Sequence, residues 1–181
     1  MAYRLAEPPI SKPLCEMSKK ELEAYRFWFE ISVPPRLNQL RSLVRLSRGF
    51  GDWPTDFSLS SLDRLSEWGS DVLKADPKWS ESPTDLSILF DIGIYMGECL
   101  VSSSPLIVWE QNIRAPRNDV NFGAMVINGP SDLKFDPYQI VHIASLKLRD
   151  GRCDSDWLRR TFDLQRSLLI DGWDGLPLSK S

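Results

Sequence analysis

Residues 83–101 read PTDLSILFDIGIYMGECLV and form the longest mainly apolar stretch of this chain. Read as a helix, the stretch is apolar on most sides, and such a helix is usually buried. It also contains Asp91 and Glu98, which lie seven residues apart and therefore on one helix face, with Tyr95 between them. A buried carboxylate must find hydrogen-bond donors or become protonated. We therefore expect this helix to be the centre of the fold, with Asp91, Tyr95 and Glu98 as its buried polar groups.

Helix start and stop signals divide the rest of the chain. Ser18 and Glu21 match a capping box, and Ser82-Pro83 and Asp136-Pro137 each place an N-cap residue before a proline at the first helical position. Pro34-Pro35 predicts the end of the first helix, because neither residue can extend the hydrogen-bond ladder. The predicted helices cover residues 18–33, 35–48, 59–74, 82–101, 136–150 and 155–170.

The hydrophobic period changes after residue 105. Residues 106–110 and 122–127 are short and rich in β-branched and aromatic side chains, which is typical of strands, and residues 133–135 could add a third. The polar stretch between the first two strands predicts a hairpin with a long loop. Because the strands are segregated from the helices, the pattern favours an α+β fold. We expect about six helices packed with a small antiparallel β-hairpin or three-stranded meander.

The same signals suggest how the chain is organised. Residues 1–17 contain three prolines and little periodicity, so they predict an extended N-terminal arm. Residues 18–170 predict a single globular domain, which at this size can bury about 70% of the surface of its unfolded chain. Residues 171–181 contain two glycines and a proline and predict a C-terminal tail.

The composition of the chain limits the kinds of partner that we expect it to bind and the cellular compartment in which we expect to find it. The chain has 181 residues and a formal net charge of −3, whereas binding to phosphate backbones needs a basic surface, so nucleic acid is not the expected partner. Its three cysteines show no metal-binding spacing. Residues 1–15 are broken by charges and prolines, and no apolar run reaches the length of about 18 residues expected of a membrane span. We therefore expect a cytoplasmic protein that does not bind membranes.

Asp91 and Glu98 could also act as a general acid and base if an open cleft reached both of them. The alternative is that each carboxylate is anchored structurally by backbone amides, a tryptophan N–H or an arginine. Metal sites in helical bundles add a Glu-x-x-His motif, but His142 is the one histidine of the chain. The sequence contains no nucleophile elbow, phosphate loop or dinucleotide fingerprint. We expect no metal, no cofactor and no catalytic activity.

Seven tryptophans are a further notable feature of this chain. Trp53 follows Asp52 in a predicted loop, and Trp173 lies between Asp171 and Asp174 in the predicted tail. Tryptophan is enriched at the centres of protein interfaces, so these five residues are candidate contacts for a protein partner. The alternative is that the loop tryptophans fold back over the core.

Three short motifs carry a resemblance to known proteins. These are DIGIYMGE at residues 91–98, VWE at 108–110 and FDPY at 135–138. In this combination, within residues 85–144, the chain resembles small bacterial α+β proteins of the toxin-immunity or accessory type. The resemblance implies a small, acidic, cytoplasmic protein that binds a protein partner, and it assigns no role to an individual residue.

The leading hypothesis is therefore an immunity protein without enzymatic activity that binds and neutralises a cognate bacterial toxin. In this hypothesis acidic side chains cover a basic site on the toxin while tryptophans supply buried area. The first alternative is a small enzyme that uses Asp91 and Glu98 in a cleft beside Tyr95. The second is a homo-oligomeric scaffold protein built on exposed helix faces.

Overall fold

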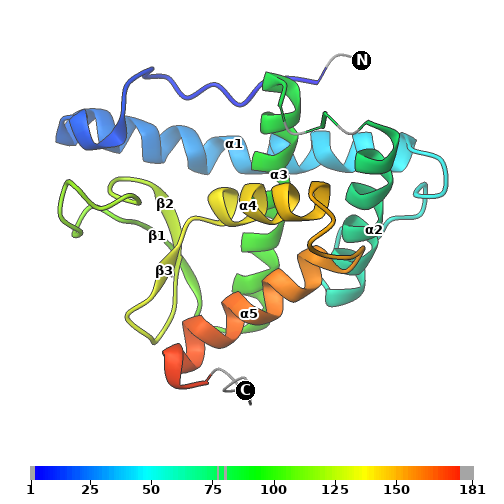
Figure 1. Ribbon diagram of the computed structural model, residues 1–181. Helices are drawn as coiled ribbons and strands as arrows, with labels where there is room; N and C mark the ends of the chain where they lie inside the picture. The colour runs from blue at the N-terminus through cyan, green and yellow to red at the C-terminus, as the bar shows by residue number, and fades with distance from the viewer. Residues whose placement is uncertain (1–2, 77, 80, 176–181) are drawn as a thin grey trace.

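The computed structural model describes residues 3–76, 78–79 and 81–175. Within them the fold is α+β, with five α-helices and one three-stranded antiparallel sheet (Figure 1), which confirms the predicted class. The elements are η1 (Leu14–Glu16), α1 (Lys19–Leu46), α2 (Leu59–Ala75), α3 (Pro83–Ser103), β1 (Val108–Gln111), β2 (Met125–Asn128), β3 (Lys134–Phe135), α4 (Pro137–Arg149), α5 (Trp157–Asp171) and η2 (Gly172–Gly175).

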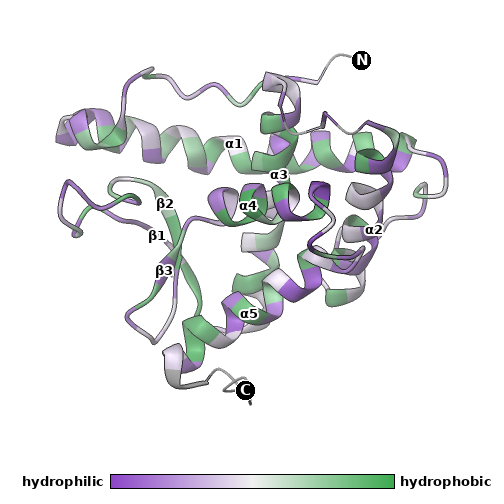
Figure 2. Cartoon of the chain, viewed as in Figure 1, coloured by the Kyte–Doolittle hydropathy of each residue, from purple (hydrophilic) through white to green (hydrophobic). Residues whose placement is uncertain are grey.

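Helix α3 is the centre of the fold. More than half of its residues are buried, and it contacts every other α-helix as well as β1 and β2. Figure 2 shows few hydrophilic residues along it below the first turn. Its start is the predicted one, since the Ser82 side chain accepts a hydrogen bond from the backbone N–H of Asp85 and Asp85 closes a capping box. The signals in the sequence therefore place the central helix correctly.

The expectation that no segment has the length of a membrane span needs a correction. By length and apolar composition α3 could cross a bilayer, because its most apolar window of 18 residues contains no more than two charged residues. However, 67% of its most apolar window is buried inside the protein. Burial of this extent is what the core helix of a globular protein shows.

The prediction that Pro34-Pro35 ends the first helix is wrong, and α1 runs through both prolines. This merges two of the six predicted helices and leaves five. The buried residues Phe29, Arg36 and Leu40 lie before and after the prolines on one stripe of the helix. Burial on both sides of the prolines keeps α1 continuous, although each proline removes a backbone hydrogen bond.

The sheet is the predicted meander, in the order β1-β2-β3. Both pairings are antiparallel, with Trp109 opposite Ile127 and Ile127 opposite Phe135. Strands β1 and β2 begin two to three residues later than predicted. Ile127 is fully buried at the centre of the sheet, so the sheet contributes to the same core as α3.

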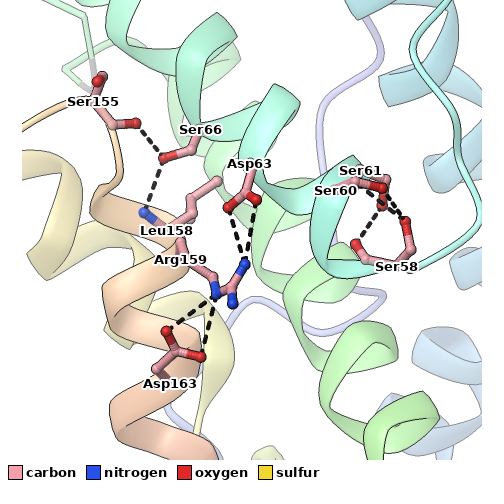
Figure 3. Close-up of polar contacts among 9 residues, drawn as sticks. All are labelled: Ser58, Ser60, Ser61, Asp63, Ser66, Ser155, Leu158, Arg159 and Asp163. Carbon is pink, nitrogen blue, oxygen red and sulfur yellow. Dashed lines mark hydrogen bonds and ion pairs between the residues drawn. The ribbon is translucent and has the colours of Figure 1, made fainter.

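Helices α2 and α5 are joined by polar contacts that Figure 3 shows. The Ser66 hydroxyl of α2 accepts a hydrogen bond from the backbone N–H of Leu158 at 3.1 Å and donates one to the carbonyl of Ser155 at 2.6 Å. Arg159 adds an ion pair with Asp63 of α2 at 3.2 Å. These bonds satisfy part of the first turn of α5, for which Asp156 provides no side-chain cap.

The N-terminal segment from residue 3 and the end of α5 lie on different sides of the core (Figure 1). From residue 3 the N-terminal segment runs along α1 in the opposite direction and passes through η1 before α1 begins (Figure 1). At the other end, Asp171 is the last residue of α5 and Gly172–Gly175 form η2, so the predicted tail begins inside a helix.

Candidate functional site

Asp91 lies at the junction of α3, α1 and the N-terminal arm. Its side chain is fully buried, and its two carboxylate oxygens accept hydrogen bonds from Nε and Nη2 of Arg36, the second at 3.0 Å. The hydroxyl of Tyr3 donates a further hydrogen bond to the same carboxylate. Every oxygen of Asp91 therefore has a donor, as the structural interpretation of this residue requires.

Arg36 also holds the arm in place. Its Nη1 donates to the carbonyl of Leu5 at 3.1 Å, and its Nη2 donates to the carbonyl of Arg4 at 3.3 Å. The backbone N–H of Ala6 donates to the Ser87 hydroxyl at 2.9 Å. The arm is thus tied to α1 and α3 by a set of bonds that the sequence did not reveal, because no local pattern pairs residue 3 or 36 with residue 91.

Burial sets the protonation chemistry of this cluster. It raises the pKa of Asp91 to about 6, and hydrogen bonds and charge from Arg36 oppose part of that rise. Burial also raises the pKa of Tyr3 well above its usual value, so the phenol keeps its proton and remains a donor. At neutral pH the cluster therefore consists of the Arg36–Asp91 ion pair and an uncharged Tyr3, whose hydroxyl donates a hydrogen bond to Asp91.

Tyr95 and Glu98 do not share a site with Asp91. The Tyr95 hydroxyl lies 2.6 Å from the Ser61 hydroxyl and accepts a hydrogen bond from the backbone N–H of Phe57 at 3.2 Å. Glu98 is half-buried and accepts a hydrogen bond from the indole Nε1 of Trp109 at 2.9 Å. Each of the three polar groups on this face of α3 has its own partner on a different element, which favours the structural interpretation over a shared acid–base cleft.

Trp53 does not have the exposure that a partner contact needs. Its side chain is fully buried, packs against Tyr95 with 5.0 Å between ring centroids, and donates through Nε1 to the carbonyl of Ser61 at 2.8 Å. The loop therefore folds back over the core, which was the alternative for this tryptophan. Asp52 beside it is exposed. The prediction of a contact surface around Trp53 is corrected for this reason.

Trp173 has the opposite environment, since 67% of its surface is exposed. It lies in η2, directly after α5, two residues after the exposed Asp171. The end of α5 is fixed to the β2–β3 turn, where the backbone N–H of Ser131 donates to the carbonyl of Leu169 at 3.0 Å. The side chain of Asp174 lies outside the part of the chain that the structure describes.

A second candidate site is a cavity of about 520 Å³ between the arm, α1, α3 and the first turn of α4. Its walls include the half-buried rings of Tyr25, Trp28, Phe90 and Tyr138. No local sequence pattern indicates this cavity, because its residues come from four separate segments of the chain. Among the described residues, no group of three or more His, Cys, Asp or Glu side chains could hold a metal ion.

Comparisons of the chain with protein-family models, with curated proteins and with solved structures found no match. The resemblance to toxin-immunity proteins therefore has no support beyond the three short motifs that carry it.

Proposed function

We propose that this chain is a protein-binding module without enzymatic activity, and that its partner is a bacterial toxin that it neutralises in the cytoplasm. The observation that carries the proposal is the exposed indole of Trp173 at the end of α5. Tryptophan is enriched among the few residues that contribute most of the binding energy of protein interfaces.

The surroundings of Trp173 suggest what the partner looks like. Asp171 and Asp132 are both exposed, the first at the end of α5 and the second in the β2–β3 turn that is bonded to α5. With a net charge of −3 the whole chain adds to this negative field. An acidic surface around an apolar anchor is complementary to a basic site, and charge complementarity speeds association in low salt.

The elements that hold Trp173 favour binding with little rearrangement. The bond between Ser131 and Leu169 fixes the end of α5 against the sheet. Gly129 allows this contact, because a Cβ at this position would lie 2.5 Å from the carbonyl oxygen of Leu169. An anchor mounted on a fixed helix loses less freedom on binding than one on a loose loop.

The test begins with the full-length protein purified under gentle conditions at low and at high salt from the cells that make it. A stoichiometric partner identified by mass spectrometry is then expressed alone and together with this chain. We expect the partner alone to arrest growth and co-expression to restore it. We expect Trp173→Ala to weaken binding of the purified partner by about 30-fold, which corresponds to the loss of one interface hot spot.

Phe27→Ala is the matched control, because Phe27 is 63% exposed but lies on α1. It should leave the affinity unchanged. Equal effects of the two substitutions would remove Trp173 as the anchor. A partner that binds but does not arrest growth would overturn the immunity role while leaving protein binding intact, and a failure to recover any partner would overturn both.

A further inference from the structure

The cavity beneath the N-terminal arm has the size of a small-molecule site. Its volume of about 520 Å³ falls within the range of about 300–1,000 Å³ that is usual for ligand pockets. One wall is the arm itself, at Leu5 to Pro8. Arg36 donates a hydrogen bond to this wall, and the wall donates one to the hydroxyl of Ser87, so it is held in position. The cavity is therefore part of the ordered fold.

Four aromatic rings form a continuous wall of this cavity. The ring centroids of Tyr25 and Trp28 are 5.8 Å apart, those of Trp28 and Phe90 are 6.1 Å apart, and those of Phe90 and Tyr138 are 5.8 Å apart. All four side chains are half-buried, so part of each ring remains free to contact a ligand. The faces of aromatic rings carry partial negative charge and attract cations, most strongly at tryptophan.

The charges around the wall are negative on balance. Glu7 is the one formally charged residue among those of the described chain that line the cavity. A smaller adjoining cavity of about 60 Å³ shares Tyr25, Phe90 and Tyr138 with it and also contains Asp136.

Arg36 does not reverse this balance. Its guanidinium lies 5.7 Å from the Phe90 ring centroid, so a cation of the protein already uses this ring, but the carboxylate of Asp91 matches its charge. The rest of the aromatic wall is left without a cation of its own among the residues that line the cavity.

From these observations we infer that the cavity binds a small organic cation of the quaternary-ammonium class. The rings of Tyr25, Trp28, Phe90 and Tyr138 contact its methyl groups, and Glu7 at the rim attracts its charge. An aromatic wall with few polar atoms suits such a ligand better than a metal ion or a phosphate, since those would need several oxygen or N–H partners. The inference does not depend on the Trp173 surface, which shares no residue with this cavity.

The test compares two probes of the same shape. One is choline, and the other is its uncharged isostere in which a tert-butyl group replaces the trimethylammonium group. Calorimetry and the indole N–H resonance of Trp28, assigned from the spectrum of Trp28→Phe, report binding to the full-length protein. We expect choline to bind about tenfold more tightly than the isostere and to shift the Trp28 resonance.

Two variants connect the binding to the site. Trp28→Ala should weaken choline binding by about tenfold, whereas Trp173→Phe, the control, should not change it. If Trp28→Ala does not fold, as judged by its thermal melting, Glu7→Gln takes its place, because Glu7 is exposed and should weaken binding severalfold without affecting the fold. Equal binding of both probes, no binding of choline, or a choline affinity unaffected by these substitutions would each overturn the inference.

Discussion

Arg36 of α1 and Asp91 of α3 form a two-pronged ion pair that is almost completely removed from water. The exposed fractions of their side chains are 9% and 0%. Two nitrogens of the guanidinium face the two carboxylate oxygens, and Arg36 also donates to carbonyls of the arm and of Ser87 in α3. A pair in this environment is expensive to break, because either member alone would be an uncompensated buried charge.

Asp91→Asn should therefore lower the free energy of unfolding by about 3–5 kcal/mol, since it leaves the charge of Arg36 unmatched. Urea denaturation measures the change. The double substitution of Arg36→Met with Asp91→Leu should cost less than Asp91→Asn alone, because it removes both charges. Glu67→Gln, which breaks the exposed pair with Arg64, is the control and should change stability by less than about 1 kcal/mol. Equal stability of Asp91→Asn and the unmodified protein would refute a structural role for the pair.

The half-buried Asp136 predicts a pH dependence of stability. Burial raises its pKa to about 6 in the folded protein, although N–H groups of Tyr138 and Gln139 oppose the rise, whereas an unfolded chain has a value of about 3.9. The folded state thus binds the proton more tightly. This contribution to stability is complete below about pH 4 and is lost as the pH rises through about 6.

The variant Asp136→Asn isolates this effect, because asparagine caps a helix about as well as aspartate and does not titrate. Stability is measured by urea denaturation of both proteins between about pH 4 and pH 7. The stability of the unmodified protein relative to the variant should fall as the pH rises over this window. A difference that stays constant with pH would show that Asp136 does not titrate as proposed.

Gly93 lies where α3 and α4 approach each other closely. A Cβ at this position would lie 2.8 Å from the Cα and 2.9 Å from the N of Tyr138, so backbone would have to move. Gly93→Ala should therefore destabilise the protein by about 1–3 kcal/mol, although alanine is the better helix former by about 1 kcal/mol. Thermal unfolding measures the change. Gly51→Ala, where the nearest atom would be 3.8 Å away, should be close to neutral, and similar effects at both positions would argue against a close packing contact.

The exposed prolines of α1 offer a stabilising substitution. Pro34 has no N–H to bond to the carbonyl four residues earlier, and its ring crowds that carbonyl. Pro34→Ala should raise the free energy of unfolding by about 2 kcal/mol, after allowance for the greater freedom that alanine gives the unfolded chain. Chemical denaturation tests this, and a loss of stability would mean that the proline ring makes a packing contact that matters more than the missing bond.

The elements that the sequence predicts well are those with local causes. The caps at Ser18, Ser82 and Asp136 start helices as predicted, because each cap needs only residues within one turn. The continuity of α1 through Pro34-Pro35 could not be predicted in this way. It depends on burial against α3, a tertiary effect that outweighs the local preference.

The candidate sites likewise depend on tertiary contacts that no local sequence pattern predicts. Trp53 and Trp173 both lie outside the predicted helices and strands, so the sequence makes them equal candidates for a partner contact. In the structure the ring of Trp53 is buried in the core, whereas that of Trp173 is exposed. The partners of Asp91 lie 55 and 88 residues away in the chain, and no spacing rule relates them to it. The aromatic cavity could not be predicted for the same reason, since Trp28 and Tyr138 meet only after the chain has folded.

The contacts of the N-terminal arm affect the order in which the protein folds during its synthesis. Tyr3 is synthesised 88 residues before Asp91, and Arg36 is synthesised 55 residues before it. Until α3 leaves the exit tunnel, the buried face of α1 has nothing to cover it and the arm has nothing to hold. We therefore expect the arm to stay open in the nascent chain until α3 has been made and has docked, so that the arm becomes ordered only together with residues synthesised long after it.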